Sequence, residues 1–264
     1  MISYESFFIL ILASILGPIV GLLILIFYSG NEKKLYFLEV ENRQVTLQKE
    51  LEISRYLQLN QQIQPHFLFN ALNSLLGLIR LKQYDRLTTS FEHMVLYLRS
   101  KYTNNDPLYP LQNEISYTNN YLEIQKLRFG HRLKIEWEIE GNLNKALVIP
   151  YLLQTLVENA FKHGLEMIEE EAELFIRIQL AELGQIRLIV EDNGPGFKEN
   201  TDLISIVDTA GNVGLLNIKR RLTLLFPNQT SMTVRNSNDN GGAVVEVMWP
   251  YCVTFPMTEE EERV

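Results

Sequence analysis

The segment QIRLIVEDNGPGF, residues 185–197, decides the fold of the C-terminal half of this 264-residue chain. Four of its first eight residues are apolar, and the run predicts a strand that ends at Asp192. Gly194 and Gly196 follow at once, and glycine lets a backbone adopt positive φ or approach a ligand closely. A carboxylate at such a strand end can accept a hydrogen bond from an exocyclic amine, such as that of adenine. A plain tight turn is the alternative interpretation.

The residues on both sides of this segment alternate between strand and helix patterns. Further strands are predicted at 134–140, 173–180, 230–236 and 243–250, with a short extended entry at 146–150. Helices are predicted at 151–163, which Gly164 ends, and at 214–226. Residues 198–213 show little periodicity and predict a mobile loop. This alternation predicts an α+β fold with helices on one face of a mixed sheet.

The sequence before the sheet is helical in character. Residues 65–80 and 84–102 predict two helices joined by a short turn, and hence a hairpin. Two such hairpins from a homodimer would form a four-helix bundle. A further helix is predicted at 111–129, closed by Gly130. Residues 31–64 contain neither Pro nor Gly and predict a helical linker, for which a dimeric coiled coil is one interpretation.

The N-terminal segment 7–28 is apolar and carries no charge over its 22 residues. A helix of about 20 apolar residues spans a bilayer core, so a single transmembrane anchor is predicted. A signal peptide, the alternative, has a basic start and a shorter apolar run. Because Lys33, Lys34 and Arg43 follow the segment, the positive-inside rule places the rest of the chain in the cytoplasm. The predicted location is therefore the bacterial inner, or cytoplasmic, membrane.

The composition is that of a folded protein, with 46% hydrophobic and 21% charged residues. The formal net charge of −8 and the lack of a basic cluster argue against direct nucleic-acid binding. Cys252 is the only cysteine, so no internal disulfide can form, which fits a reducing compartment.

Two more motifs carry candidate binding chemistry. ENAFKHG, residues 158–164, lies on a predicted helix, where Asn159 offers a carbonyl oxygen suited to Mg²⁺. Lys162 and His163 follow one turn later and could meet a phosphate. GNVGLLN, residues 211–217, opens the next helix, and glycine-rich helix entries bind anions through free backbone N–H groups. Its candidate binding residues are Gly211, Gly214, Leu215 and Asn217. An ordinary polar helix face and a capped loop are the alternatives.

The order and spacing of these three motifs resembles the GHKL ATPases (gyrase, Hsp90, histidine kinases and MutL) over roughly residues 145–250. The resemblance implies a GHKL α/β sandwich that binds ATP and Mg²⁺. In this family, residues matching Asn159 bind the metal and residues matching Asp192 read adenine. The loop after the DNGPG turn would be a lid over the phosphates.

A motif upstream separates the branches of that family. QPHFLFN, residues 64–70, followed by Asn73, resembles the phosphoacceptor box of the LytS-type sensor histidine kinases and extends the resemblance to residues 55–250. It implies that a neutral ring nitrogen of His66 takes the γ-phosphoryl group of ATP and passes it to an aspartate of a LytTR-type response regulator. His66 and Asn70 share a helix face, so Asn70 could orient the ring or position a water. The histidines outside this box are His93, His131 and His163.

Three positions depart from the family pattern. Asn212 stands where the family usually has Gly, Ala243 stands where it often has Thr, and no acidic residue adjoins His66. The general base is therefore open, and Glu158 is a candidate orienting or basic group. Two alternatives to a kinase remain: a degenerate kinase that acts as a nucleotide-binding signalling scaffold, and a GHKL ATPase that releases free phosphate.

The predicted organisation has five parts. These are a transmembrane anchor at 1–30, a helical linker at 31–64, a dimerisation and phosphoacceptor region at 65–130, a GHKL ATP-binding domain at 131–252 and an acidic tail at 253–264.

Overall fold

The computed structural model describes most of the chain from residue 65 onward and scattered positions before it. The described residues are 16, 21, 27–28, 33–34, 36–48, 51, 65–103, 106–141, 143–197, 213–237 and 241–254. Contacts divide the chain into two units, Met1–Arg55 and Tyr56–Val264.

In the first unit, residues 36–48 are helical, within the predicted linker. The predicted membrane segment 7–28 lies outside the described residues except at four positions. Among the helices that the structure describes, none has the length and apolar character needed to cross a membrane.

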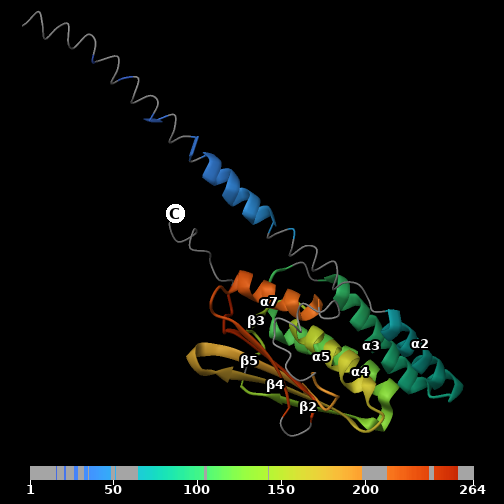
Figure 1. Ribbon diagram of the computed structural model, residues 1–264. Helices are drawn as coiled ribbons and strands as arrows, with labels where there is room; N and C mark the ends of the chain where they lie inside the picture. The colour runs from blue at the N-terminus through green and yellow to red at the C-terminus, as the bar shows by residue number, and fades with distance from the viewer. Residues whose placement is uncertain are drawn as a thin grey trace, which may run out of the picture. The chain divides into compact units, whose positions relative to one another are not determined.

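The second unit is built on a five-stranded sheet with the order β2-β4-β5-β7-β6 (Figure 1). Its strands are β2 (Leu133–Ile139), β4 (Ala172–Ala181), β5 (Gln185–Asp192), β6 (Ser231–Asn236) and β7 (Ala243–Pro250). β2 runs parallel to β4, and the other neighbouring pairs are antiparallel. A two-stranded sheet pairs β1 (Tyr109–Pro110) with β3 (Leu147–Val148). The prediction of a mixed sheet is confirmed, and the strand that ends at Asp192 is its central one.

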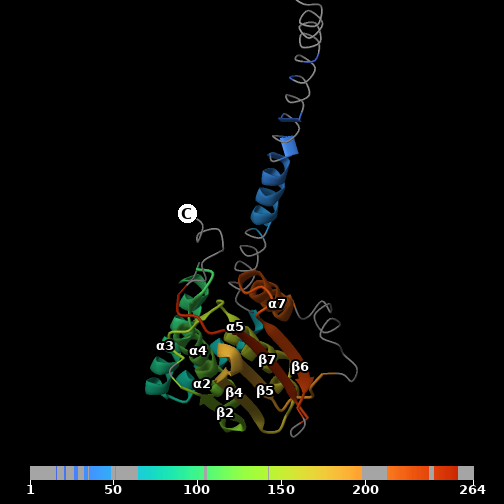
Figure 2. The ribbon, with the colours of Figure 1, turned by 90° about the vertical axis from the view of Figure 1, so that its left-hand side faces the viewer.

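Helices cover one face of this sheet. Figures 1 and 2 show α5 (Leu152–His163) and α7 (Val213–Leu225) on that face, and α4 (Leu111–Phe129) lies against α5. Along β4, Leu174, Ile176 and Ile178 are buried, while the residues between them face the open side of the sheet. This two-residue period is what a strand covered on one face requires. The predicted α+β layering is therefore confirmed.

The predicted hairpin is also present, as α2 (Pro65–Arg80) and α3 (Tyr84–Thr103). Its turn places Lys82 at φ 57°, and the backbone N–H of Gln83 donates to the carbonyl oxygen of Leu78 at 2.9 Å. The hairpin packs against α4 through three rings: Phe67 of α2 lies 4.9 Å from both Tyr97 of α3 and Tyr121 of α4, measured between ring centroids. Such aromatic contacts add to the free energy gained by burial.

Trp249 of β7 joins the two sheets. Its side chain is fully buried, and its indole Nε1 donates a hydrogen bond of 3.0 Å to the carbonyl oxygen of Leu147 in β3. A buried carbonyl that loses its donor is costly, so this bond fixes the small sheet against the end of the large one.

We expect Trp249→Phe to lower the free energy of unfolding by about 2–4 kcal/mol, because it leaves a buried carbonyl without this donor and opens a cavity. Urea denaturation followed by far-UV circular dichroism measures the change. Trp137→Phe on β2 is the matched control, since Trp137 is only partly buried. Equal losses in the two variants would contradict the proposed role of the Trp249 hydrogen bond.

Candidate functional site

The end of α5 and the turn after β5 meet without room for side chains. A β-carbon built on Gly164 would lie 2.4 Å from Oδ1 of Asp192, and one built on Gly194 would lie 2.3 Å from the α-carbon of Gly164. One built on Gly242 would lie 1.6 Å from the carbonyl oxygen of Asp192. Only glycine fits at these three positions, so the ENAFKHG and DNGPGF motifs are in direct contact.

The Asp192 carboxylate sits at the centre of this contact and is 5% exposed. Its Oδ1 accepts hydrogen bonds from the backbone N–H groups of Gly194 at 2.9 Å and Ala243 at 3.5 Å. Burial raises the pKa of Asp192 to about 6, although these two hydrogen bonds lower it. A carboxylate offers about four acceptor positions, so Asp192 can still accept a hydrogen bond from a ligand.

Asn159 lies near the start of α7. A β-carbon on Gly214 would be 3.0 Å from Cγ2 of Thr155 and 3.9 Å from Nδ2 of Asn159. That Nδ2 atom is buried and has no hydrogen-bond partner among the described residues. A buried amide without a partner costs free energy that a ligand can recover. The amide oxygen beside it is a hard ligand of the kind Mg²⁺ takes, so these residues fit a site for Mg²⁺ and phosphate.

The remaining predicted binding residues differ in how far they are exposed. Lys162 and His163 are exposed at the end of α5. Desolvation and the Lys162 cation lower the pKa of His163, although Glu166 raises it, and this shift favours the neutral ring. Leu215 is buried and Asn217 half-buried on α7. Gly211 lies outside the described residues.

Asn236 at the end of β6 is a residue that sequence reasoning missed. Its Oδ1 accepts from the backbone N–H of Phe197 at 2.6 Å, and its Nδ2 donates to the Phe197 carbonyl oxygen at 2.9 Å. A β-carbon on Gly196, at φ 69°, would lie 2.8 Å from that Oδ1. Asn236 therefore fixes the end of the DNGPGF turn. Nothing in the local sequence of β6 signals this role.

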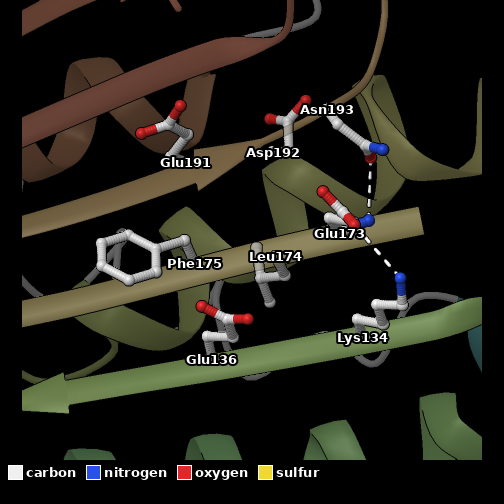
Figure 3. A pocket seen from close by; sticks show the side chains of 8 residues that line it. All are labelled: Lys134, Glu136, Glu173, Leu174, Phe175, Glu191, Asp192 and Asn193. Carbon is white, nitrogen blue, oxygen red and sulfur yellow. Dashed lines mark hydrogen bonds and ion pairs between the residues drawn. The ribbon is translucent and has the colours of Figure 1, made fainter. Parts of the chain in front are cut away.

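The opposite side of the sheet has a shallow cavity beside Asp192, shown in Figure 3. Acidic side chains dominate its lining, which includes Glu136, Glu173 and Glu191; of these, Glu173 faces Lys134, whose Nζ lies 3.6 Å from its Oε1. This acidic surface would repel a polyphosphate. The geometry therefore favours the helix-covered side, where Asn159 and Gly214 lie, as the nucleotide site.

His66 is exposed on the first turn of α2, as its predicted role requires. Nδ2 of Asn70 lies 3.3 Å from each ring nitrogen of His66, so Asn70 can hydrogen-bond either one, depending on the tautomer. Phe67, the next residue, is buried and fixes this turn of the helix. The two predicted residues His66 and Asn70 thus lie side by side on the hairpin, whereas the predicted Mg²⁺ ligand Asn159 lies on α5.

Glu158 points to the hairpin. Its Oε1 accepts from Nζ of Lys101 at 3.0 Å, from Nε2 of Gln154 at 2.7 Å and from the hydroxyl of Tyr97 at 3.4 Å. Of the two roles considered for Glu158, these contacts favour the orienting one. Lys101, which the sequence patterns did not single out, is 3% exposed.

Comparison with known proteins gives consistent matches. A family profile described as Histidine kinase matches residues 54–133. The chain is 29% identical over 204 residues to the sensor histidine kinase YesM of Bacillus subtilis, a match that covers 76% of this chain and 33% of YesM. It is 34% identical over 168 residues to the uncharacterized protein YwpD of the same bacterium, with 62% and 59% covered. It is 28% identical over 222 residues to the sensor protein LytS of Bacillus cereus, with 81% and 37% covered.

The chain thus spans 33% to 59% of the length of these curated relatives. The family profile covers the hairpin that presents His66, and the alignments with YesM and LytS, over 204 and 222 residues, extend well beyond that profile. Motifs, fold and relatives agree: residues 54–133 match the Histidine kinase profile, and the chain is similar to the LytS-type sensor histidine kinases over most of its length.

Proposed function

We propose that this chain is the kinase of a two-component system: it binds ATP with Mg²⁺ between α5, the end of β5 and α7, and phosphorylates itself on His66. The observation that carries the proposal is the convergence of three motifs on α5. Asp192 contacts Gly164 at its C-terminal end, and Gly214 packs beside Asn159. The enzyme class would be ATP:protein-L-histidine phosphotransferase.

In this mechanism the lone pair of a neutral His66 ring nitrogen attacks the γ-phosphorus. The bond from that phosphorus to the β,γ-bridging oxygen breaks, and its electron pair leaves with ADP. Asn70 orients the ring before the reaction: its Nδ2 donates to the unprotonated ring nitrogen and has to release the lone pair of that nitrogen when the attack begins. Mg²⁺, held by Asn159, would supply charge neutralisation on the phosphates. Asp192 would fix the adenine amine, and Lys162 a phosphate. The phosphoryl group then passes to an aspartate of a response regulator, for which the family resemblance suggests the LytTR type.

We also propose that the protein is a homodimer, with α2 at the interface. Phe69, Leu72, Leu76 and Ile79 of α2 are 43% to 65% exposed and recur at spacings of three, four and three residues. That spacing is the seam of a helix that packs against another helix. Phe91 and Val95 add exposed apolar surface on α3. A second copy supplies an identical apolar seam.

We place the protein in the bacterial cytoplasmic membrane, with a single pass and cytoplasmic C-terminal domains. The uncharged segment 7–28 and the basic residues that follow it support this location.

The role of His66 is tested with His66→Gln in the full chain, purified in detergent. We expect γ-labelled ATP to label the wild-type protein with a base-stable, acid-labile bond, and the variant to carry no label while it binds ATP with unchanged affinity. Asn159→Ala should lose both label and Mg²⁺-dependent affinity. Nucleotide binding without any label in the wild type would favour the degenerate-kinase alternative, and steady phosphate release without label would favour a GHKL ATPase.

The role of Asp192 predicts a pH dependence. The ionised carboxylate accepts from the adenine amine more strongly than the protonated group does, so affinity for ADP should fall as the pH drops through about 6. Between pH 7 and pH 5 we expect a loss of about tenfold, the change set by one pH unit below the pKa. Isothermal titration calorimetry measures it. The phosphates of ADP titrate in the same way with both proteins and give a common background. Asp192→Asn should bind ADP more weakly than wild type at pH 7. It should also lack the additional loss of affinity at low pH that protonation of Asp192 causes. Parallel pH curves for the two proteins would refute this role.

The dimer interface predicts that Leu72→Glu combined with Leu76→Glu raises the dissociation constant of the dimer by about 100-fold or more, because each leucine side chain contributes about 1.5–3 kcal/mol when buried. Analytical ultracentrifugation of the full chain in detergent measures this. Leu183→Glu is the matched control, since Leu183 is 98% exposed in a turn far along the sequence. A double variant that remains dimeric would exclude this seam.

A further inference from the structure

A buried ion pair joins the hairpin that carries His66 to the helix that carries Asn159. Nζ of Lys101 on α3 lies 3.0 Å from Oε1 of Glu158 on α5, and the two side chains are 4% and 14% exposed. Lys101 and Glu158 are 57 residues apart in the sequence. This is the most buried of the ion pairs among the described residues, because every other pair has side chains that are at least 18% exposed.

The surroundings of Lys101 hold its ammonium group in place. It lies 5.4 Å from the centre of the Tyr97 ring and 5.5 Å from that of Tyr151, within the range of a cation–π interaction. The Tyr151 hydroxyl donates to the backbone carbonyl oxygens of Ser100 and Lys101, each at 3.2 Å. Tyr151 directly precedes α5. The last turn of α3 is thus attached to α5 at the start of the helix and again at Glu158.

Stability alone does not account for this pair. A buried ion pair rarely stabilises a fold more than apolar side chains of the same volume, because both charges lose their hydration. The ion pair does, however, fix the orientation of α5, because only one rotation of this helix about its axis brings Glu158 to Lys101. Successive helix residues are turned by about 100°, so that rotation also sets where the next residue, Asn159, points. In this structure Asn159 points toward Gly214.

A second contact reinforces the first. The Tyr121 ring of α4 lies 4.9 Å from Phe67, which adjoins His66, and 5.6 Å from Phe161 of α5. Phe67 and Phe161 therefore share one aromatic neighbour. The hairpin contacts α5 through this cluster and through Lys101, on both sides of Asn159 in the sequence.

We infer that Lys101 is a positioning residue for phosphoryl transfer. Through its ion pair with Glu158 it holds α5 in the rotation that directs Asn159 at the Mg²⁺-bound phosphates. It does so only while the His66 hairpin is packed against α5. This inference rests on the proposed function. It implies that the gain in nucleotide affinity caused by Mg²⁺ depends on Lys101, a residue of the hairpin that lies outside the proposed nucleotide site.

The test compares ADP affinity with and without Mg²⁺ in the full chain, by calorimetry. In wild type we expect Mg²⁺ to tighten binding. In Lys101→Met we expect the Mg²⁺-dependent gain to fall at least tenfold, while the affinity in EDTA, which depends on Asp192, stays within twofold. His66 labelling at saturating ATP should fall in parallel. Lys101→Arg should restore both, because a guanidinium group also pairs with Glu158. Arg177→Met, which breaks the exposed pair with Glu138, should change neither.

Removal of Lys101 leaves the Glu158 charge buried without this partner, so Lys101→Met could unfold the protein. The double variant Lys101→Met and Glu158→Gln removes both charges and keeps the fold, and the same loss of the Mg²⁺-dependent gain is expected. A folded single or double variant that keeps the wild-type gain would overturn the inference. So would an increase in His66 labelling, since the pair would then restrain the enzyme. If wild type carries no label, the kinase proposal fails, but the Mg²⁺ titration still decides the role of Lys101.

Discussion

Burial of the Asp192 carboxylate at the end of β5 is the constraint on which the rest of the site depends. A carboxylate that is 5% exposed needs donors, and here they come from backbone N–H groups of the following turn and of β7. Backbone can approach this closely only where no β-carbon intervenes, which requires glycine at 164, 194 and 242. The carboxylate thereby fixes the end of α5, the turn after β5 and the start of β7 at one point.

With its C-terminal end fixed at Asp192, α5 becomes the element through which the other parts of the site are related. The glycine at its C-terminal end contacts the Asp192 carboxylate, its middle presents Asn159 toward α7, and Glu158 contacts Lys101 of the hairpin. A rigid helix transmits a rotation at one position to every other position along it. The position of the hairpin and the geometry of the proposed phosphate site are therefore linked through a single helix, which is the kind of coupling that the proposed kinase function would use.

The sequence patterns predicted the parts of the fold that depend on local repetition. Strand patterns in the sequence predicted β2, β4, β5, β6 and β7, and the QPHFLFN motif predicted the helix that exposes His66. The patterns could not reveal pairs between distant segments. Lys101 looks like an ordinary charged residue near a helix end, and Asn236 looks like a strand-end polar residue, yet one binds Glu158 and the other binds the backbone of Phe197. Such contacts depend on how elements pack, and no local period encodes them.

Helix α2 shows how one short segment can meet three requirements at once. With about 100° per residue, its buried side chains occupy one sector of the helix surface and its exposed apolar side chains a second. The first sector holds Phe67, Ala71, Leu75 and Leu78, and the second holds Phe69, Leu72, Leu76 and Ile79. His66, Asn70 and Asn73 lie in the third sector, between the other two. A helix with two apolar sectors is held on both, by its own domain and, as proposed, by a second copy. That leaves only the histidine sector open to solvent, as the proposed transfer from a nucleotide to His66 and on to a response regulator needs.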